Sequence, residues 1–223
     1  MRIAGGTSGA FQANWYVVGP ENGSECVIID PGQDAAGPCR RAVAAAGLAP
    51  AAVLATHGHI DHIADAAELA DGYGVPLHIH AQDRPFLTDP VAALSPELGH
   101  FFGSLFPGPF QEPADVREYQ IEGEYGTGAL GIGGLVFELR HAPGHTPGST
   151  LLALGGAEPL VFTGDVVFAG SIGRTDFRVG DPAAMRRSLA RQVLTLPDAA
   201  RLLPGHGPAT TLARERRTNP FLR

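Results

Sequence analysis

Three histidines and an aspartate are crowded into the run Thr56-His57-Gly58-His59-Ile60-Asp61-His62. The run follows the apolar stretch 52–55 and precedes an alanine-rich segment, which predicts a tight loop between a strand and a helix. Residues two apart in an extended segment project from the same side. Imidazole nitrogens together with a carboxylate oxygen suit zinc or a similar divalent ion. The run therefore predicts a metal site at the end of a strand.

Three further metal-binding residue types occur in glycine-rich turns. They are His145 in Pro-Gly-His-Thr-Pro-Gly, Asp165 in Phe-Thr-Gly-Asp and His206 in Pro-Gly-His-Gly. Each follows a strand candidate closely, and each taken alone is equally consistent with a turn residue or a helix cap. Because all three recur in the same setting, we expect them to meet the 56–62 run at one edge of the fold.

Short apolar runs bounded by Gly, Pro or Asp are candidate strands, and alanine-rich stretches between them are candidate helices. The strand candidates are residues 15–18, 26–29, 52–55, 76–80, 135–139, 150–154, 160–162 and 201–203. The helix candidates are residues 34–46, 62–73 and 182–194. This interleaving, with hairpin-like pairs among the strands, predicts an α/β fold of sheets with helices packed outside.

A length of 223 residues fits one domain spanning 1–223. Residues 84–128 are rich in Pro, Gly and Phe with weak periodicity, and we interpret them as an insertion or lid. The phenylalanines gathered there, which are candidates for a wall of a substrate cleft, are Phe101, Phe102, Phe106 and Phe110.

The charge balance excludes several functions. Sixteen basic against 23 acidic residues give a net charge of −7, with no basic run, so we expect no nucleic-acid partner. The chain contains no lysine, which excludes Schiff-base chemistry and a P-loop lysine. Without an export signal or a membrane-length apolar segment, we expect a cytoplasmic protein with no membrane partner. Cys26 and Cys39 form no Cys-x-x-Cys pair and are interpreted as inert.

The order of the 57–62 run, His145, Asp165 and His206 along the chain resembles the metallo-β-lactamase fold superfamily. The resemblance implies an αββα sandwich, with two mixed β-sheets flanked by helices. It implies one metal held by His57, His59 and His145 and a second held by Asp61, His62 and His206, with Asp165 bridging both. It also implies that Asp30, in Ile-Ile-Asp-Pro-Gly, orients a ligand imidazole.

A narrower likeness lies in Gly-Ser-Ile-Gly-Arg-Thr-Asp-Phe at 170–177 and Thr-Asn-Pro-Phe-Leu at 218–222. Both resemble the short glyoxalase II-like branch, related to hydroxyacylglutathione hydrolase. The branch implies hydrolysis of a small-molecule thioester of the S-2-hydroxyacylglutathione type by a metal-bridging hydroxide. Two divalent ions are expected, zinc first, with iron or manganese as alternatives. Asp61 and Asp165 are then the expected catalytic residues, and Arg174 and Arg178 are candidates to meet a substrate carboxylate.

One alternative function stays open. A persulfide dioxygenase would use a single iron held by His57, His145 and Asp165, leaving positions free for oxygen. The remaining histidines fall outside the expected ligand set: we interpret His78 and His80 as structural, and assign no role to His100 or His141. The oligomeric state is left open by the sequence.

Overall fold

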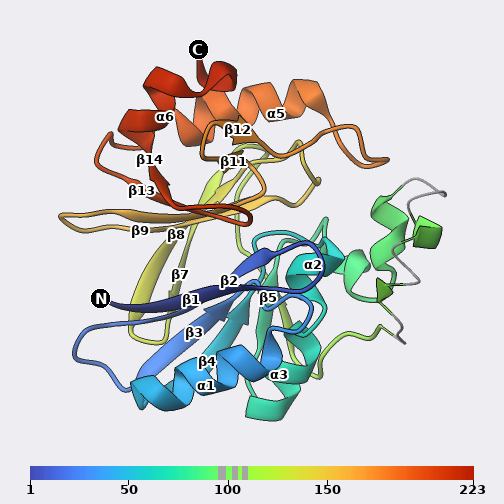
Figure 1. The fold of residues 1–223 in the computed structure, drawn as a ribbon, viewed down its shortest axis with the longest axis vertical. Helices are drawn as coiled ribbons and strands as arrows, with labels where there is room; N and C mark the ends of the chain where they lie inside the picture. Colours follow the sequence, from blue (N-terminus) through green and yellow to red (C-terminus); the bar gives the residue numbers. More distant parts are fainter. Residues whose placement is uncertain (95–98, 102–104, 107–109) are drawn as a thin grey trace.

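Two β-sheets lie face to face in the computed structural model, which describes residues 1–94, 99–101, 105–106 and 110–223 (Figure 1). The first sheet has the order β1-β2-β3-β4-β5-β6. Its strands are β1 Arg2–Ser8, β2 Ala13–Gly19, β3 Glu25–Ile29, β4 Ala49–Leu54, β5 Leu77–Ile79 and β6 Val116–Glu118. Strands β3 to β6 pair in parallel, whereas β1, β2 and β3 pair antiparallel, so the sheet is mixed.

The second sheet has the order β14-β13-β10-β9-β8-β7 and is also mixed, because β10 and β13 pair in parallel. Its strands are β7 Thr127–Ile132, β8 Leu135–His141, β9 Thr150–Leu154, β10 Leu160–Gly164, β13 Arg201–Pro204 and β14 Thr210–Thr211. A small separate hairpin is formed by β11 Val167–Phe168 and β12 Ser171–Ile172.

Helices cover the outer face of each sheet (Figure 1). Helices α1 Ala36–Ala46 and α3 Ala66–Tyr73 pack on the first sheet. Helix α5 Pro182–Ser188, the π-helix η3 Leu189–Val193 and α6 Leu212–Thr218 pack on the second. The short helices are α2 Ile60–Ile63, η1 Arg84–Leu87, η2 Pro90–Ala93 and η4 Pro220–Leu222. The expected αββα sandwich of the metallo-β-lactamase type is confirmed.

Strands of the first sheet are apolar on both faces because their alternating side chains are buried in two different layers. In β3, Ile28 points to the layer beneath α1 and α3, while Ile29 points to the layer between the sheets. Strand β8 alternates differently: Leu135, Phe137 and Leu139 are buried between the sheets, and Val136 on the other face is 69% exposed. Burial on both faces produces the continuous apolar runs of the first sheet.

Several element boundaries differ from the sequence prediction. The helix predicted over 62–73 is divided into α2 and α3, because Asp65 turns away, its N–H donating to Pro31 O and its carboxylate accepting from Ala36 N. The helix predicted over 182–194 ends as a π-helix, where the Gln192 carbonyl accepts a hydrogen bond from Arg140. Strand β1 was missed because Gly5 and Gly6 interrupt its apolar pattern.

The range 84–128, interpreted as an insertion or lid, contains η1, η2 and also β6, which extends the first sheet beside β5. Of its phenylalanines, Phe106 is buried, Phe101 is exposed, and Phe102 lies outside the described residues. Cys26 and Cys39 are both buried free thiols, which agrees with an inert role. Within the described residues, no helix is long and apolar enough to cross a bilayer.

Candidate metal centre

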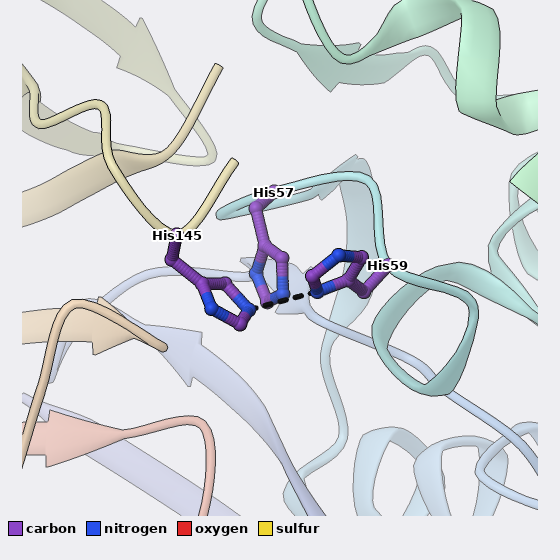
Figure 2. A group of neighbouring side chains, drawn as sticks. All are labelled: His57, His59 and His145. Carbon is purple, nitrogen blue, oxygen red and sulfur yellow. Dashed lines mark hydrogen bonds between the residues drawn. The ribbon is translucent and has the colours of Figure 1, made fainter. Parts of the chain in front are cut away.

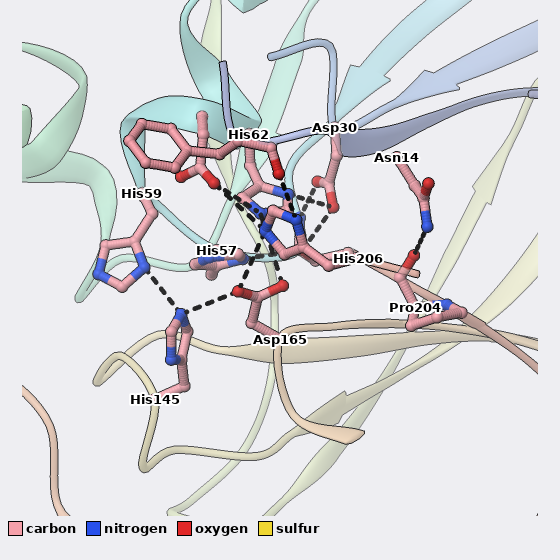
Figure 3. A network of polar contacts seen from close by, with 12 residues as sticks. Asn14, Asp30, His57, His59, His62, His145, Asp165, Pro204 and His206 are labelled. Atoms are coloured by element: carbon pink, nitrogen blue, oxygen red, sulfur yellow. Dashed lines mark hydrogen bonds and ion pairs between the residues drawn. The ribbon is translucent and has the colours of Figure 1, made fainter. Parts of the chain in front are cut away.

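All seven predicted metal ligands meet at one edge of the sandwich, between the two sheets (Figure 3). The run 57–62 leaves the end of β4 in the first sheet. His145, Asp165 and His206 follow β8, β10 and β13 in the second sheet. Each residue therefore stands in a loop or, for Asp61 and His62, in the short helix α2 just beyond a strand end, where the rigid sheet fixes its position.

The first group consists of His57, His59 and His145 (Figure 2). All three side chains are buried, and one ligand atom from each lies within 4.8 Å of the others. His59 Nδ1 and His145 Nε2 are 2.8 Å apart. The Nε2 atoms of His57 and His59 are buried without a hydrogen-bond partner. This group matches the ligand set implied for one metal.

The second group consists of Asp61, His62 and His206, with ligand atoms again within 4.8 Å of one another. His206 Nε2 lies 3.2 Å from Asp61 Oδ2 and 3.2 Å from His62 Nε2. His62 Nε2 is 3.6 Å from Asp61 Oδ2. This group matches the set implied for the second metal.

Asp165 lies between the two groups. Its Oδ2 is 3.4 Å from His145 Nε2 and 3.6 Å from His206 Nε2, and its Oδ1 is 3.5 Å from His62 Nε2. Oδ1 is buried and has no hydrogen-bond partner. The carboxylate thus lies close to ligand atoms of both groups.

The donor atoms fit a divalent cation in each group. Ligands about 2.05 Å from a tetrahedral ion stand about 3.3 Å from one another, which is close to most of these separations. Imidazole nitrogens that face each other, as in His59 with His145 and His62 with His206, leave lone pairs that a cation would satisfy. His57 Nε2, which is buried without a hydrogen-bond partner, points to the same conclusion, because such an atom is costly unless something binds it.

The electrostatics differ between the groups. Burial lowers the pKa of His57, His59 and His145, so these imidazoles are neutral and ready to coordinate. Burial opposes protonation of His62 as well, but the carboxylates of Asp61 and Asp165 outweigh it and raise the pKa of His62 to about 10. Without a cation, the second group therefore balances its carboxylates with a proton that a metal ion would displace.

Polar contacts behind the ligands hold their rings in place. Asp30 accepts hydrogen bonds from Thr56 N and Thr56 Oγ1, both at 2.7 Å, and its Oδ2 is 3.4 Å from His62 Nδ1. Thr56 Oγ1 is in turn 3.1 Å from His57 Nδ1. Asp30 therefore reaches one ligand imidazole directly and another through Thr56, a residue that sequence reasoning did not select.

Backbone carbonyls orient two further rings. His145 Nδ1 is 2.8 Å from Arg174 O, and His206 Nδ1 is 3.1 Å from Phe11 O. If these nitrogens carry the proton, Nε2 of each ring is left as the ligand atom. No sequence pattern predicts which backbone carbonyl will contact a histidine ring, because every residue has a carbonyl.

A cleft opens over the two groups. It is lined by Phe11, His59, Ile60, Asp61, Pro90, Leu94, His145, Asp165, Phe168, Ile172, Arg174, Phe177 and His206. Pro90 and Leu94 of the range 84–128 line the cleft, whereas none of the phenylalanines proposed for its wall is a lining residue in the described part of the chain. Phe106 of the same segment stacks on Phe11, with ring centroids 6.2 Å apart.

The two arginines considered as substrate contacts are placed differently. Arg174 lines the cleft, lies over the Phe177 ring at 4.2 Å, and pairs with Asp176 through Nε and Nη2 at 2.7 and 2.8 Å. Arg178 is exposed and is not among the residues that line the cleft in the described part of the chain. Arg174 is thus the better candidate.

The histidines left outside the ligand set are placed elsewhere. His80 stacks on His141, with ring centroids 4.2 Å apart, and His141 Nε2 lies 2.8 Å from Pro147 O. His78 stacks on Tyr119, and His100 is exposed. Among the described residues, none of the four belongs to a group of three that would hold a metal.

The comparison with known families agrees with the fold and the site. Residues 8–206 match the family model of the metallo-β-lactamase superfamily. An uncharacterized protein of Mycobacterium tuberculosis is 42% identical over 100% of this chain and 98% of its own length. The hydroxyacylglutathione hydrolase GloC of Haemophilus influenzae is 35% identical over 96% of this chain and 94% of its own length. The chain belongs to the metallo-β-lactamase superfamily.

Solved structures lead to the same family. The BLEG-1 B3 metallo-β-lactamase has a TM-score of 0.84 at 33% identity and covers 99% of both chains. TTHA1623, solved in a di-iron-bound form, has a TM-score of 0.79 at 35% identity and covers 98% of this chain and 100% of its own. ETHE1 from Myxococcus xanthus has a TM-score of 0.74 at 27% identity and covers 99% of this chain and 84% of its own. This membership, together with the His/Asp groups, supports an enzyme that binds divalent metal.

Proposed function

We propose that this protein is a metal-dependent hydrolase that cleaves small-molecule thioesters of the S-2-hydroxyacylglutathione type. The observation that carries the proposal is the presence of two donor groups joined by Asp165. His57, His59 and His145 would hold one divalent ion and Asp61, His62 and His206 the other, with Asp165 contacting both. Zinc is the first choice, since imidazole and carboxylate ligands suit it, with iron or manganese as alternatives.

Two divalent ions held by these residues would supply Lewis acidity and would lower the pKa of a bound water toward about 7. The residues of the chain would orient the reactants and exclude water. Asp61 and Asp165 both line the cleft, and their carboxylates would orient the attacking hydroxide and receive its hydrogen bond. The apolar side chains of Phe11, Phe168 and Phe177 would exclude water from the cleft.

The make-up of the cleft favours a thioester over an amide or an alkyl ester. Among the described residues that line it, every titratable side chain apart from Arg174 either belongs to a donor group or is Asp165, which lies between the groups. These residues therefore include no separate acid to protonate a leaving group. A thiolate, whose conjugate acid has a pKa of about 8.5, leaves without such help, whereas an alkoxide or amide anion does not.

The likeness to GloC, named a hydroxyacylglutathione hydrolase, supports the same substrate class. Arg174 is the only cation that lines the described cleft, and we assign it to a carboxylate of the substrate. Its pairing with Asp176 uses Nε and Nη2, which leaves Nη1 for the substrate.

A persulfide dioxygenase is the second candidate. His57, His145 and Asp165 would hold a single iron through two imidazoles and one carboxylate, and the likeness to ETHE1 is consistent with this chemistry. The hydrolase is favoured because the second donor group is complete.

A paired assay tests the choice. Purified protein is analysed for bound metal, then assayed for S-lactoylglutathione hydrolysis and for oxygen uptake with glutathione persulfide. We expect about two ions per chain and thioester turnover, and His57→Ala and Asp165→Ala should abolish that turnover while the protein remains folded. About one iron per chain with oxygen uptake, or unchanged hydrolysis in both variants, would overturn the proposal.

A further inference from the structure

A second buried aspartate, Asp83, lies behind the first group of donors. It stands between β5 and η1, and its side chain is completely buried. It is not a member of either donor group, and sequence reasoning did not select it. The three hydrogen bonds of its side chain are all made to loops that carry metal-binding histidines.

The contacts of Asp83 connect two loops from different sheets. Oδ2 accepts hydrogen bonds from Gly58 N at 2.8 Å and from Thr146 Oγ1 at 2.6 Å, and Oδ1 accepts one from Gly148 N at 2.6 Å. Gly58 stands between His57 and His59, and Thr146 follows His145. One carboxylate thus links the two turns that present all three histidines of the first group.

Glycines make this close approach sterically feasible. A Cβ atom at Gly148 would lie 2.6 Å from Asp83 Cγ, and one at Gly58 would lie 2.8 Å from Asp83 O and 3.1 Å from Asp83 Cβ. Any side chain at either position would push the turn away from the carboxylate. Glycine at these two positions therefore allows both turns to approach Asp83 closely.

The charge of Asp83 is not balanced by a cation. Among the described residues, no arginine or histidine forms an ion pair with it. Burial raises the pKa of Asp83 to about 6, although the hydrogen bonds from Thr146, Gly58 and Gly148 oppose the rise. A buried carboxylate contributes little to stability by itself, since its desolvation offsets the hydrogen bonds it gains. A role in placing the loops accounts better for its position.

We propose that Asp83 is a positioning residue that sets the spacing between the His57–His59 turn and the His145 turn, and thereby the affinity and geometry of the first metal ion. The inference rests on the proposed function only in requiring that this group binds a divalent ion. Asp30 contacts His62 of the second group and reaches His57 of the first group through Thr56, whereas Asp83 links the two turns of the first group.

Asp83→Asn tests the assignment. The amide keeps the size but replaces one acceptor by a donor, which would face Gly58 N, Thr146 Oγ1 or Gly148 N and break at least one link. The first ion is isolated by working in a His206→Ala background, which removes a donor of the second group. Affinity for Zn²⁺ is measured by competition with a chelator, and site geometry by the visible spectrum of the Co²⁺-loaded protein. We expect affinity to fall about 10- to 100-fold with an altered spectrum.

Glu215→Gln provides a matched control. Glu215 is also fully buried, and it accepts hydrogen bonds from a backbone N–H, a threonine hydroxyl and an asparagine amide. These come from Gly170, Thr210 and Asn219, none of which forms a hydrogen bond with a histidine of the first group among the described residues. A merely structural role for Asp83 predicts that both variants lower the melting temperature and leave Zn²⁺ affinity unchanged. That outcome would overturn the inference.

Thr146 supplies a second, milder pair of variants in case Asp83→Asn fails to fold. Thr146→Val removes the hydroxyl that donates to Asp83, whereas Thr146→Ser keeps it. We expect Val to weaken Zn²⁺ binding and Ser to restore it, and equal affinities in the two variants would contradict the inference. If the Asp83 and Thr146 variants leave Zn²⁺ affinity unchanged, the hydrolase proposal still stands. A parent protein that binds no divalent ion overturns both this inference and the hydrolase proposal.

Discussion

His62 and His206 are separated by 144 positions in the chain, yet their Nε2 atoms lie 3.2 Å apart. His62 comes from α2, which follows β4, and His206 comes from the loop after β13, so the contact joins segments that follow strands of the two sheets. A one-iron enzyme has no need of this pair, but a two-metal hydrolase does. Substitution of a residue of this pair is therefore the most direct test between the two candidate functions.

His206→Ala should release one of two bound ions and reduce S-lactoylglutathione hydrolysis by more than about 100-fold, since it removes a direct donor where even outer partners cost about 10- to 100-fold. His100→Ala, an exposed histidine outside the donor groups, is the control. Metal content and kcat/KM are measured on the same samples. Full hydrolytic activity with one ion per chain would count against the second site.

Arg174→Ala should raise KM for a carboxylate-bearing thioester about tenfold, equal to about 1.4 kcal/mol, and change kcat little. The modest size reflects an exposed guanidinium that is also paired with Asp176. Arg178→Ala is the matched control, because Arg178 is exposed and does not line the cleft. Equal KM values for the two variants would remove Arg174 from the substrate site.

Gly205→Ala should disrupt the second donor group. A Cβ atom there would lie 2.2 Å from Asp165 Oδ1 and 2.7 Å from His62 Cε1, so these side chains must move. We expect loss of one ion and about 1–3 kcal/mol of stability from overpacking. In the control Gly131→Ala, the new Cβ meets nothing within 4 Å. Metal analysis and thermal unfolding distinguish the two, and intact metal binding in Gly205→Ala would contradict the geometry.

The stability that His78 and His80 contribute to the metal-free protein should be lost as the pH falls from 6.5 to 4. Burial lowers the pKa of both His78 and His80 to about 4, so in this window the unfolded chain binds protons that the folded chain does not. Stability from these groups is thus complete above about pH 6.5 and declines below it. His78→Gln with His80→Gln should give a shallower slope of unfolding free energy against pH, measured by urea denaturation. Parallel slopes would show that these histidines do not titrate as inferred.

The donor residues were predictable because their signal is local and dense. The 57–62 run holds four of them, and glycine-rich turns mark His145, Asp165 and His206. The apolar strands were predictable for a related reason, since burial on both faces leaves long apolar runs such as Cys26–Ile29.

What escaped prediction depends on contacts between distant segments. Asp83 stands in an ordinary Ala-Gln-Asp-Arg-Pro stretch, and only folding brings it to Gly58 and Thr146. Likewise, Asp65 ends a helix that periodicity alone would continue, because it binds the first turn of α1. Arg178 was grouped with Arg174 by proximity in sequence, although only Arg174 reaches the cleft.

Each donor group draws two ligands from the segment 57–62 that follows β4 of the first sheet and one from a loop of the second sheet, with Asp165 also from the second. A chain divided in the exposed turn at Gly123, between β6 and β7, would leave each fragment with an incomplete donor set. Neither fragment would assemble a centre alone, whereas the reunited pair would. Tight metal binding would then report that the two halves had found each other, as in a split-protein sensor.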